Sequence, residues 1–509
     1  MNHLSTNRTN NVILNYLSSI VLTAITFFTA MISSRLVLKY IGDERFGAFR
    51  SLIELFGFLN LVDVGLSSSL RPLLAKAMGT GCYDEIHKIM QSSYRLFKFA
   101  LLISIFFGVV VTYFSNIIIP VPIELNSDLY LACLIFCVGT INILISPLRC
   151  LCETVQKLST INLLLVFQSM SVTLTSIFFV RLFPEWGITV LSASLTFWVF
   201  VYNGFLYIKM RHVTKSFLVN HKLDKMETLD LRDLIRSGRD NFLLMLAGRA
   251  SLQTNNLFVG LFQGQADVTK LYATQRLFEV IQTQLFAVGN ASWAALAQIY
   301  HQNKLDVFRT RVLQLLKMIM ILGLSVVVPL LFHNKEFVGL WIGSERFGGN
   351  SLTIVSALLT LALGFTVFSS WCLMSTGHLQ SVLRLSVITA ILDVSATLFF
   401  TKTLGLIGPA LGSCIVLYFV TIPWHILLLK KKFGIDLFSI AKTFKLPILT
   451  APFYIALNVY LAELFSIGSM IMLANLIFWP AIFYQIFQAY FVITKDQWRQ
   501  IKSRFHINN

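Results

Sequence analysis

Long apolar stretches separated by short polar turns occupy almost the whole chain. Clear examples are Phe99–Ile119, Leu129–Leu148, Leu158–Val180 and Trp186–Ile208, none of which carries a charge. A helix needs about 20 apolar residues to cross the hydrocarbon core of a bilayer, and strand-type alternation is not the pattern here. The pattern predicts an all-α integral membrane protein with 14 transmembrane helices.

The apolar pattern repeats at an offset of 222 residues. Each of these four segments has an apolar counterpart 222 residues later, and short identities fall in the same register. These include Gly42 with Gly264, Cys150 with Cys372, and Thr154 with Thr376. We therefore expect two six-helix repeats. Six spans is an even number, so both repeats insert in the same orientation, as in transporters with parallel repeats.

This repeat gives a domain organisation of four parts. Residues 1–208 form an N-lobe with helices 1–6, and residues 241–432 form a C-lobe with helices 7–12 around a central cleft. The polar segment 209–240 is a cytoplasmic linker, and residues 433–509 supply two extra helices and a cytoplasmic C-terminus. Each lobe is expected to move as a rigid body.

The composition excludes an ordinary soluble protein, because 56% of the residues are hydrophobic and only 13% are charged. The first apolar stretch, Thr9–Ser34, is too long for a secretory signal and is read as a retained helix. The seven cysteines and nine histidines show no metal-ligand spacing. We expect no metal site and no cofactor.

The net charge of +17 is explained by membrane topology. With the N-terminus in the cytoplasm, most of the 41 basic residues fall in inner segments, as the positive-inside rule requires. Both termini are then cytoplasmic. The charge gives no reason to expect a nucleic-acid partner.

Charged residues inside the predicted spans gather on helices 1, 2, 7 and 8. Such residues are costly in a membrane and usually face a cavity or a partner. The four arginines are expected to bind the substrate, because a guanidinium fork suits phosphate oxygens. The carboxylates are candidates for ion coupling or for ion pairing, and the two interpretations stay open. The arginines are Arg35, Arg50, Arg249 and Arg276, and the carboxylates are Glu54, Glu279 and, on helix 11, Asp393.

The segments Ser34–Gly42, Phe46–Phe49 and Leu61–Leu66 carry a family resemblance. They resemble the opening motifs of O-antigen and exopolysaccharide flippases in the multidrug/oligosaccharidyl-lipid/polysaccharide exporter superfamily. The resemblance implies a protein of the bacterial cytoplasmic (inner) membrane that flips an undecaprenyl-diphosphate-linked oligosaccharide by alternating access. It also implies coupling to a proton or sodium gradient, and a polysaccharide polymerase and chain-length proteins as partners.

Three alternatives remain at this point. A lipid II flippase is favoured by the Arg-x-x-Glu element Arg276–Glu279, although the first span lacks an arginine before Arg35. A multidrug exporter of the same fold would be expected to carry more acid than arginine in its cleft. A membrane polysaccharide polymerase would need a larger outer loop with catalytic charges. We expect a transporter and not an enzyme.

Overall fold

The computed structural model describes residues 2–59, 61–80, 83–154, 158–218, 231–252, 254–465 and 467–492. Within these ranges every regular element is helical, which confirms the predicted all-α class, while the count of 14 transmembrane helices stays a prediction. The chain divides into two compact units, Met1–Thr269 and Lys270–Asn509. In the predicted linker, helices occupy both ends, and residues 219–230 lie outside the described ranges. The lobe boundaries and the 222-residue repeat stay predictions.

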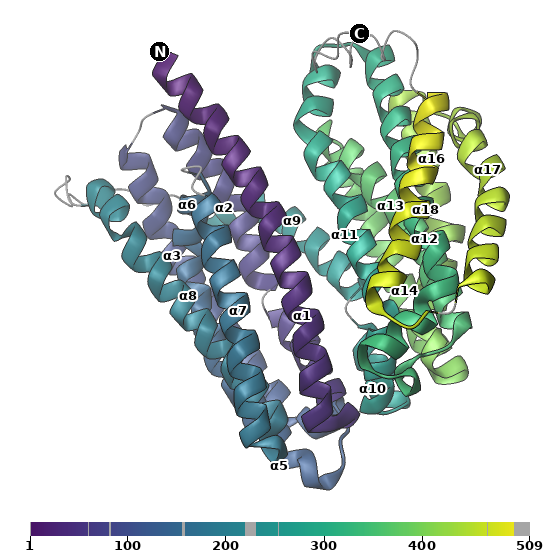
Figure 1. The fold of residues 1–509 in the computed structure, drawn as a ribbon. Coiled ribbons are helices and arrows are strands. Elements are labelled where there is room, and N and C mark those ends of the chain that lie inside the picture. The colour runs from purple at the N-terminus through teal and green to yellow at the C-terminus, as the bar shows by residue number, and fades with distance from the viewer. Residues whose placement is uncertain are drawn as a thin grey trace. The chain divides into compact units, whose positions relative to one another are not determined.

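The first unit contains ten α-helices in its described part. In chain order they are α1 (Asn2–Leu59), α2 (Leu61–Thr80), α3 (Tyr83–Tyr113), α4 (Ser115–Ile118), α5 (Asn126–Gly139), α6 (Ser146–Thr154), α7 (Leu158–Leu182), α8 (Gly187–Leu218), α9 (Leu231–Leu252) and α10 (Asn255–Phe262). Helix α7 packs along α1 and against α8, and α2 contacts α3, α6 and α9 (Figure 1).

Helix α1 is broken at Gly42. This glycine has φ 76° and ψ 177°, outside the helical region, and its positive φ is a conformation that glycine adopts without steric cost. Gly264, the residue 222 positions later, also has a positive φ of 98°. The chain therefore bends at two positions that the predicted repeat makes equivalent.

A buried carboxylate joins α5 to the start of α8. Asp128 is 2% exposed, and its side chain accepts hydrogen bonds from the backbone N–H groups of Ile188 and Thr189 at 3.0 and 2.7 Å. These are among the first N–H groups of α8, which lack partners within the helix. A carboxylate at the N-terminal end of a helix also interacts favourably with the helix dipole. Asp128 thus fixes where α8 begins.

The second unit is built from the remaining helices. They are α11 (Gln265–His301), whose first residues belong to the first unit, α12 (Leu305–Ile342), α13 (Asn350–Ser375), α14 (Leu379–Leu404), α15 (Gly408–Val416), a π-helical turn (Leu417–Thr421), α16 (Ile422–Phe433), α17 (Leu437–Leu464) and α18 (Met470–Val492).

The last two helices, α17 and α18, pack against α12. The stacked rings of Tyr454 and Tyr484 lie 4.4 Å apart between their centroids. The hydroxyl of Tyr454 donates to the backbone oxygen of Ser325 at 2.7 Å, and Gln485 donates to the Ser325 hydroxyl at 2.9 Å. Buried polar contacts therefore hold these two helices in place in addition to apolar packing.

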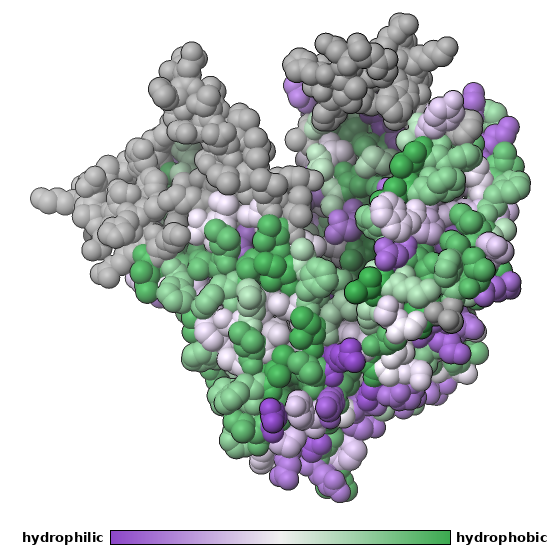
Figure 2. All heavy atoms as spheres, in the orientation of Figure 1, coloured by the Kyte–Doolittle hydropathy of each residue, from purple (hydrophilic) through white to green (hydrophobic). Residues whose placement is uncertain are grey.

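The chain is a multi-pass membrane protein. Ten helical spans of the described residues are long and apolar enough to cross a bilayer, and some of them, such as Leu379–Phe433, join several labelled helices. On the visible flank of the first unit, apolar residues cover α7 and α8, while hydrophilic residues gather at the end where α5 lies (Figure 2). Large apolar side chains such as Leu174 and Phe178 are more than 60% exposed there. A surface of this kind suits lipid.

Candidate functional site

The candidate site of the first unit lies on the last turns of α1. Arg50, Glu54 and Gly57 follow one another at spacings of four and three residues, so they share one helix face. From α9, the Nη1 atom of Arg249 donates to the backbone oxygen of Gly57 at 2.9 Å. The structure thus brings three of the predicted residues, Arg50, Glu54 and Arg249, to the same end of α1.

Arg249 reaches one of the carbonyl groups that a helix cannot satisfy internally. Because α1 ends at Leu59, the Gly57 oxygen is among its last four carbonyls. A cation at the C-terminal end of a helix also interacts favourably with the helix dipole. Arg249 is half-buried, so its guanidinium can stabilise this end of α1 and still offer further N–H groups.

Glu54 is held from the short helix α10. The side-chain amide of Asn256 donates to Glu54 Oε1 at 2.5 Å. Asn256 is buried, and Glu54 is half-buried. A carboxylate with an amide donor on one oxygen keeps acceptor capacity on the other oxygen. Its charge lies near those of Arg50 and Arg249, which gives this site two guanidinium groups for one carboxylate.

A close backbone approach positions this site. A Cβ atom at Gly47 would lie 1.8 Å from the backbone oxygen of Gln265, so only glycine lets α1 lie this close to the start of α11. The buried side chain of Gln265 accepts from Ser51 at 2.9 Å and donates to the Pro120 oxygen at 3.3 Å. The face of α1 that carries Arg50 is therefore anchored to α11.

The candidate site of the second unit is on α11. Arg276 Nη1 pairs with Glu279 Oε2 at 3.1 Å, and the Arg276 guanidinium carbon lies 5.6 Å from the centre of the Tyr272 ring. The Arg276 side chain is 20% exposed and that of Glu279 is 43% exposed. A guanidinium held between a ring and a carboxylate is pre-oriented while parts of its fork stay available to an anion.

Two predicted residues lie away from these groups. Arg35 is exposed on α1 before the break at Gly42 and makes no hydrogen bond or ion pair with the described residues. Asp393 is 2% exposed on α14, and no contact of the described residues joins it to Arg276 or Glu279. The structure thus does not gather all seven residues in one place within either unit.

The motif residue Asp63 lies in a separate ionic cluster. Its carboxylate accepts from Ser67 at 3.0 Å on α2. Nearby, Glu153 of α6 pairs with Arg71 at 2.5 Å and with Arg149 at 3.3 Å. This cluster ties α2 to α6, which fits a structural role for the Leu61–Leu66 motif.

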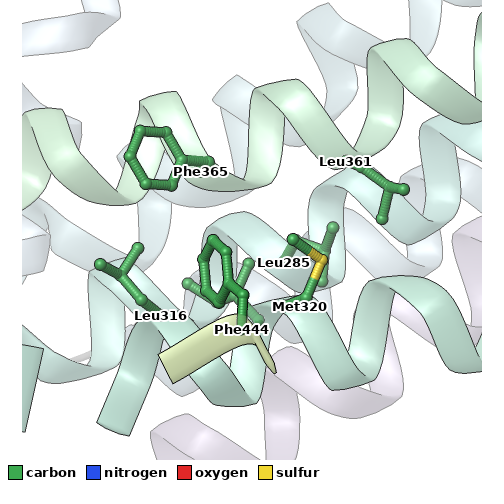
Figure 3. A pocket seen from close by; sticks show the side chains of 7 residues that line it. Leu285, Leu316, Met320, Leu361, Phe365 and Phe444 are labelled. Atoms are coloured by element: carbon green, nitrogen blue, oxygen red, sulfur yellow. The ribbon is translucent and has the colours of Figure 1, made fainter. Parts of the chain in front are cut away.

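Three hollows in the described part of the chain are lined mainly by apolar side chains. One is a cavity of ≈ 10 Å³ in the second unit, about the size of a single water, and all its lining side chains are apolar (Figure 3). Larger hollows lie beside α7 and α8, ≈ 510 Å³, and beside α17 and α18, ≈ 600 Å³. None of them contains a predicted site residue. In the described part of the chain, no group of His, Cys, Asp and Glu is arranged to hold a metal ion.

Sequence reasoning missed two residues that build the first site, Asn256 and Gln265. Both are uncharged amides, which a search for costly charges passes over. A usable signal existed for Gln265, because it follows Gly264, the repeat counterpart of Gly42. For Asn256 there was none, since its partner Glu54 is far away in the sequence.

Comparisons with known proteins identify the fold. The family model described as MatE matches residues 18–122. No curated protein sequence matches the chain. Among solved structures, the lipid II flippase MurJ in an inward closed conformation has a TM-score of 0.70 at 14% identity, and the match covers 95% of this chain and 100% of that one.

Two further structures show the same fold. An inward-facing multidrug resistance MATE family transporter of the MOP superfamily has a TM-score of 0.63 at 13% identity, covering 81% of this chain and 94% of that one. A MOP superfamily transporter from Pyrococcus furiosus, reported with a binding pocket of reverse polarity, has a TM-score of 0.59 at 14% identity, covering 82% and 95%. These matches confirm the predicted superfamily at the level of the fold.

Proposed function

We propose that this protein, which has the fold of the MOP superfamily transporters, flips an undecaprenyl-diphosphate-linked oligosaccharide from the inner to the outer leaflet of the bacterial cytoplasmic membrane. The observation that carries the proposal is the guanidinium groups held half-buried on helices. Arg50 and Arg249 accompany Glu54 in the first unit, and Arg276 lies over Tyr272 in the second. Guanidinium groups held at low exposure suit a diphosphate.

The lipid part of such a substrate would stay in the bilayer while its head passes through the protein. The hollow of ≈ 600 Å³ beside α17 and α18 offers an apolar surface for a polyprenyl tail, lined by side chains such as Phe465, Trp479 and Phe483. Contact with this surface would spare the tail exposure to water outside the bilayer core, and within the core it would rest on van der Waals packing. Transport would proceed by alternating access of two lobes.

The energy for directional transport would come from a cation gradient. Glu54, Glu279 and Asp393 are the candidate carboxylates for a proton or a sodium ion. Asp393 is the most buried of the three, at 2% exposure, and Glu54 has an amide donor that would survive protonation. A polymerase and chain-length proteins are the expected partners, and both termini are expected in the cytoplasm.

Two other substrates are compatible with this fold. A lipid II flippase is favoured by the Arg276–Glu279 pair and by the likeness to MurJ. A multidrug exporter is favoured by the likeness to MATE transporters. A lipophilic cation would have to bind beside Arg50 and Arg249 in the first unit or beside Arg276 in the second, and the charge of these guanidinium groups opposes this. A polymerase has no support from the proteins matched, which are flippases and transporters.

The test is reconstitution into proteoliposomes with a fluorescent undecaprenyl-diphosphate disaccharide, with lipid II and with ethidium. We expect the protein to move the diphosphate-linked disaccharide across the bilayer, measured as protection from a membrane-impermeant quencher. Arg276→Ala should abolish most of this movement. Ethidium transport without movement of either lipid would overturn the proposal in favour of a drug exporter. If only lipid II moves, the proposed substrate is wrong and the protein is a lipid II flippase.

A further inference from the structure

The face of α11 that follows Arg276 along the helix carries uncharged polar side chains. Binding of the substrate's diphosphate at Arg276 gives these side chains no role. Thr283 and Asn290 follow Arg276 at intervals of seven residues, so all three lie on one face of the helix. Thr283 and Asn290 are exposed, and so are Gln284 and Gln298. We call Arg276, Thr283 and Asn290 the polar face of α11.

This face is unsuited to lipid. Helix α11 has 37 residues, yet it is not among the ten described spans that are apolar enough to cross a membrane. The Thr283 hydroxyl already donates to the backbone oxygen of Glu279 at 2.9 Å, but exposed amide groups such as that of Asn290 are costly in hydrocarbon unless they have hydrogen-bond partners. The polar face of α11 therefore borders water or a polar solute when the protein is in a membrane.

A pair of tryptophans adjoins the polar face. The rings of Trp293 on α11 and Trp371 on α13 have centroids 4.7 Å apart and an interplanar angle of 74°. Because the rings are nearly perpendicular, they do not cover each other as a parallel stack would. Both side chains are half-buried, and Trp293 lies three residues after Asn290, next to the polar face.

The fold reserves space for this pair. A Cβ atom at Gly289 would lie 2.8 Å from Cδ1 of Trp371, so the glycine allows the indole ring to lie against the backbone of α11. A half-buried tryptophan that served packing alone would not need to adjoin an exposed amide. The arrangement instead offers an aromatic surface beside hydrogen-bonding groups, both without charge.

We propose that the polar face of α11 and the Trp293–Trp371 pair bind the sugar rings of the lipid-linked saccharide, an inference that rests on the proposed function. One face of a pyranose ring presents C–H groups, which pack on an aromatic ring, and its edge presents hydroxyls, which bond to amides and hydroxyls. From Arg276 to Asn290 the helix extends roughly 21 Å. A diphosphate bound at Arg276 would therefore leave room for a saccharide along this face.

The test uses the purified full chain in lipid nanodiscs with two radiolabelled lipids. One is undecaprenyl diphosphate, and the other is the same lipid carrying a disaccharide that begins with N-acetylglucosamine. We expect the wild type to bind the disaccharide lipid more tightly. Trp371→Leu and Asn290→Ala should weaken binding of the disaccharide lipid by about three- to tenfold and leave binding of the bare diphosphate lipid unchanged. Trp186→Leu, an exposed tryptophan in the turn before α8, is the matched control and should bind both lipids normally.

The outcomes separate this inference from the proposed function. If the wild type binds neither lipid, the proposed function fails. A second outcome is that the wild type binds both lipids, but Trp371→Leu and Asn290→Ala weaken the binding of both lipids equally or of neither. In that case the sugar-binding inference is wrong while the proposed function stands. Asn290→Ala keeps the test valid if Trp371→Leu does not fold, because Asn290 is exposed. Binding of tetraphenylphosphonium that is lost in Trp371→Leu, with the disaccharide lipid unaffected, would assign the pair to a lipophilic cation instead.

Discussion

Arg249 and Gly57 are joined by a hydrogen bond of 2.9 Å from the guanidinium to the backbone oxygen, which places a cation at the end of α1. The contact gives Arg249 two roles, one in the stability of the protein and one in anion binding. It stabilises the last turn of α1, and it holds the guanidinium beside the face that carries Arg50 and Glu54. A substitution at Arg249 should therefore change stability and anion binding by different amounts.

Arg249→Lys should keep the charge at the end of α1 but lose the planar fork. We expect Arg249→Ala to lower the unfolding free energy by about 1–2 kcal/mol and Arg249→Lys to lower it less. Both variants should bind undecaprenyl diphosphate more weakly than the wild type, and the alanine variant most weakly. Thermal unfolding and lipid binding measure the two effects. Arg239→Ala, an exposed arginine on the same helix, is the control. Full binding by Arg249→Lys would show that charge alone suffices.

Asn256→Ala should release Glu54 from α10. A hydrogen bond to a charged group contributes about 1.5–3 kcal/mol, so we expect a loss of stability in that range, measured by chemical unfolding in detergent. Asn255→Ala is the matched control, because the Asn255 side-chain oxygen has no hydrogen-bond partner among the described residues. Equal effects of the two substitutions would contradict a specific role for Asn256.

Gly47→Ala should displace α1 from Gln265. The new Cβ atom would meet a backbone oxygen, which cannot turn aside as a side chain can. Overpacking of this kind costs about 1–3 kcal/mol or more. Gly204→Ala on α8 has open space around it and should stabilise the protein by about 0.5–1 kcal/mol. Melting temperatures that fall for the first variant and rise for the second are the expected result.

Stability should fall below neutral pH through His378, between α13 and α14. Burial lowers the pKa of this histidine, and Lys432 lowers it further. Its Nδ1 lies 3.0 Å from the Thr376 hydroxyl, and the rings of Tyr300 and Phe433 face it. Because the folded pKa is the lower one, the unfolded chain takes up the proton first. The stability that neutral His378 gives is present above the unfolded pKa of about 6.5 and is lost as pH falls through the folded value.

His378→Gln should flatten this pH dependence. We expect the melting temperature of the wild type to fall from pH 7 to pH 5 more steeply than that of His378→Gln. His301→Gln, whose histidine is exposed, should retain the slope of the wild type. Parallel curves for the wild type and His378→Gln would exclude this histidine as the source.

Tyr454→Phe should loosen α17 from α12. The substitution removes only the hydroxyl that donates to Ser325, and we expect a loss of about 1 kcal/mol. Tyr460→Phe changes a hydroxyl on a side chain that is 60% exposed and should have almost no effect. If both variants unfold at the wild-type temperature, the apolar packing of α17 is sufficient by itself.

The apolar spans could be predicted because they depend on local composition. The hydrogen-bond partners of the charged residues could not be predicted. The spacing of Arg50 and Glu54 indicates a pair along α1, whereas the hydrogen bond that Glu54 accepts from Asn256 spans 202 residues. Arg249 has no acidic residue at helical spacing. One of its partners is the backbone oxygen of Gly57, which sequence patterns do not reveal. Contacts between distant segments are fixed by packing.

The polarity of α11 has a consequence for how the chain enters the membrane during synthesis. The translocon releases a segment into lipid according to its hydrophobicity, and charged residues near the centre of a segment oppose release. With Arg276 and Glu279 in its sequence, α11 should not partition alone. The following helix, α12, contains the most apolar of the ten described spans. The two are then expected to leave the translocon together, so α11 placed alone in a host membrane protein should fail to insert, whereas α11 followed by α12 should insert.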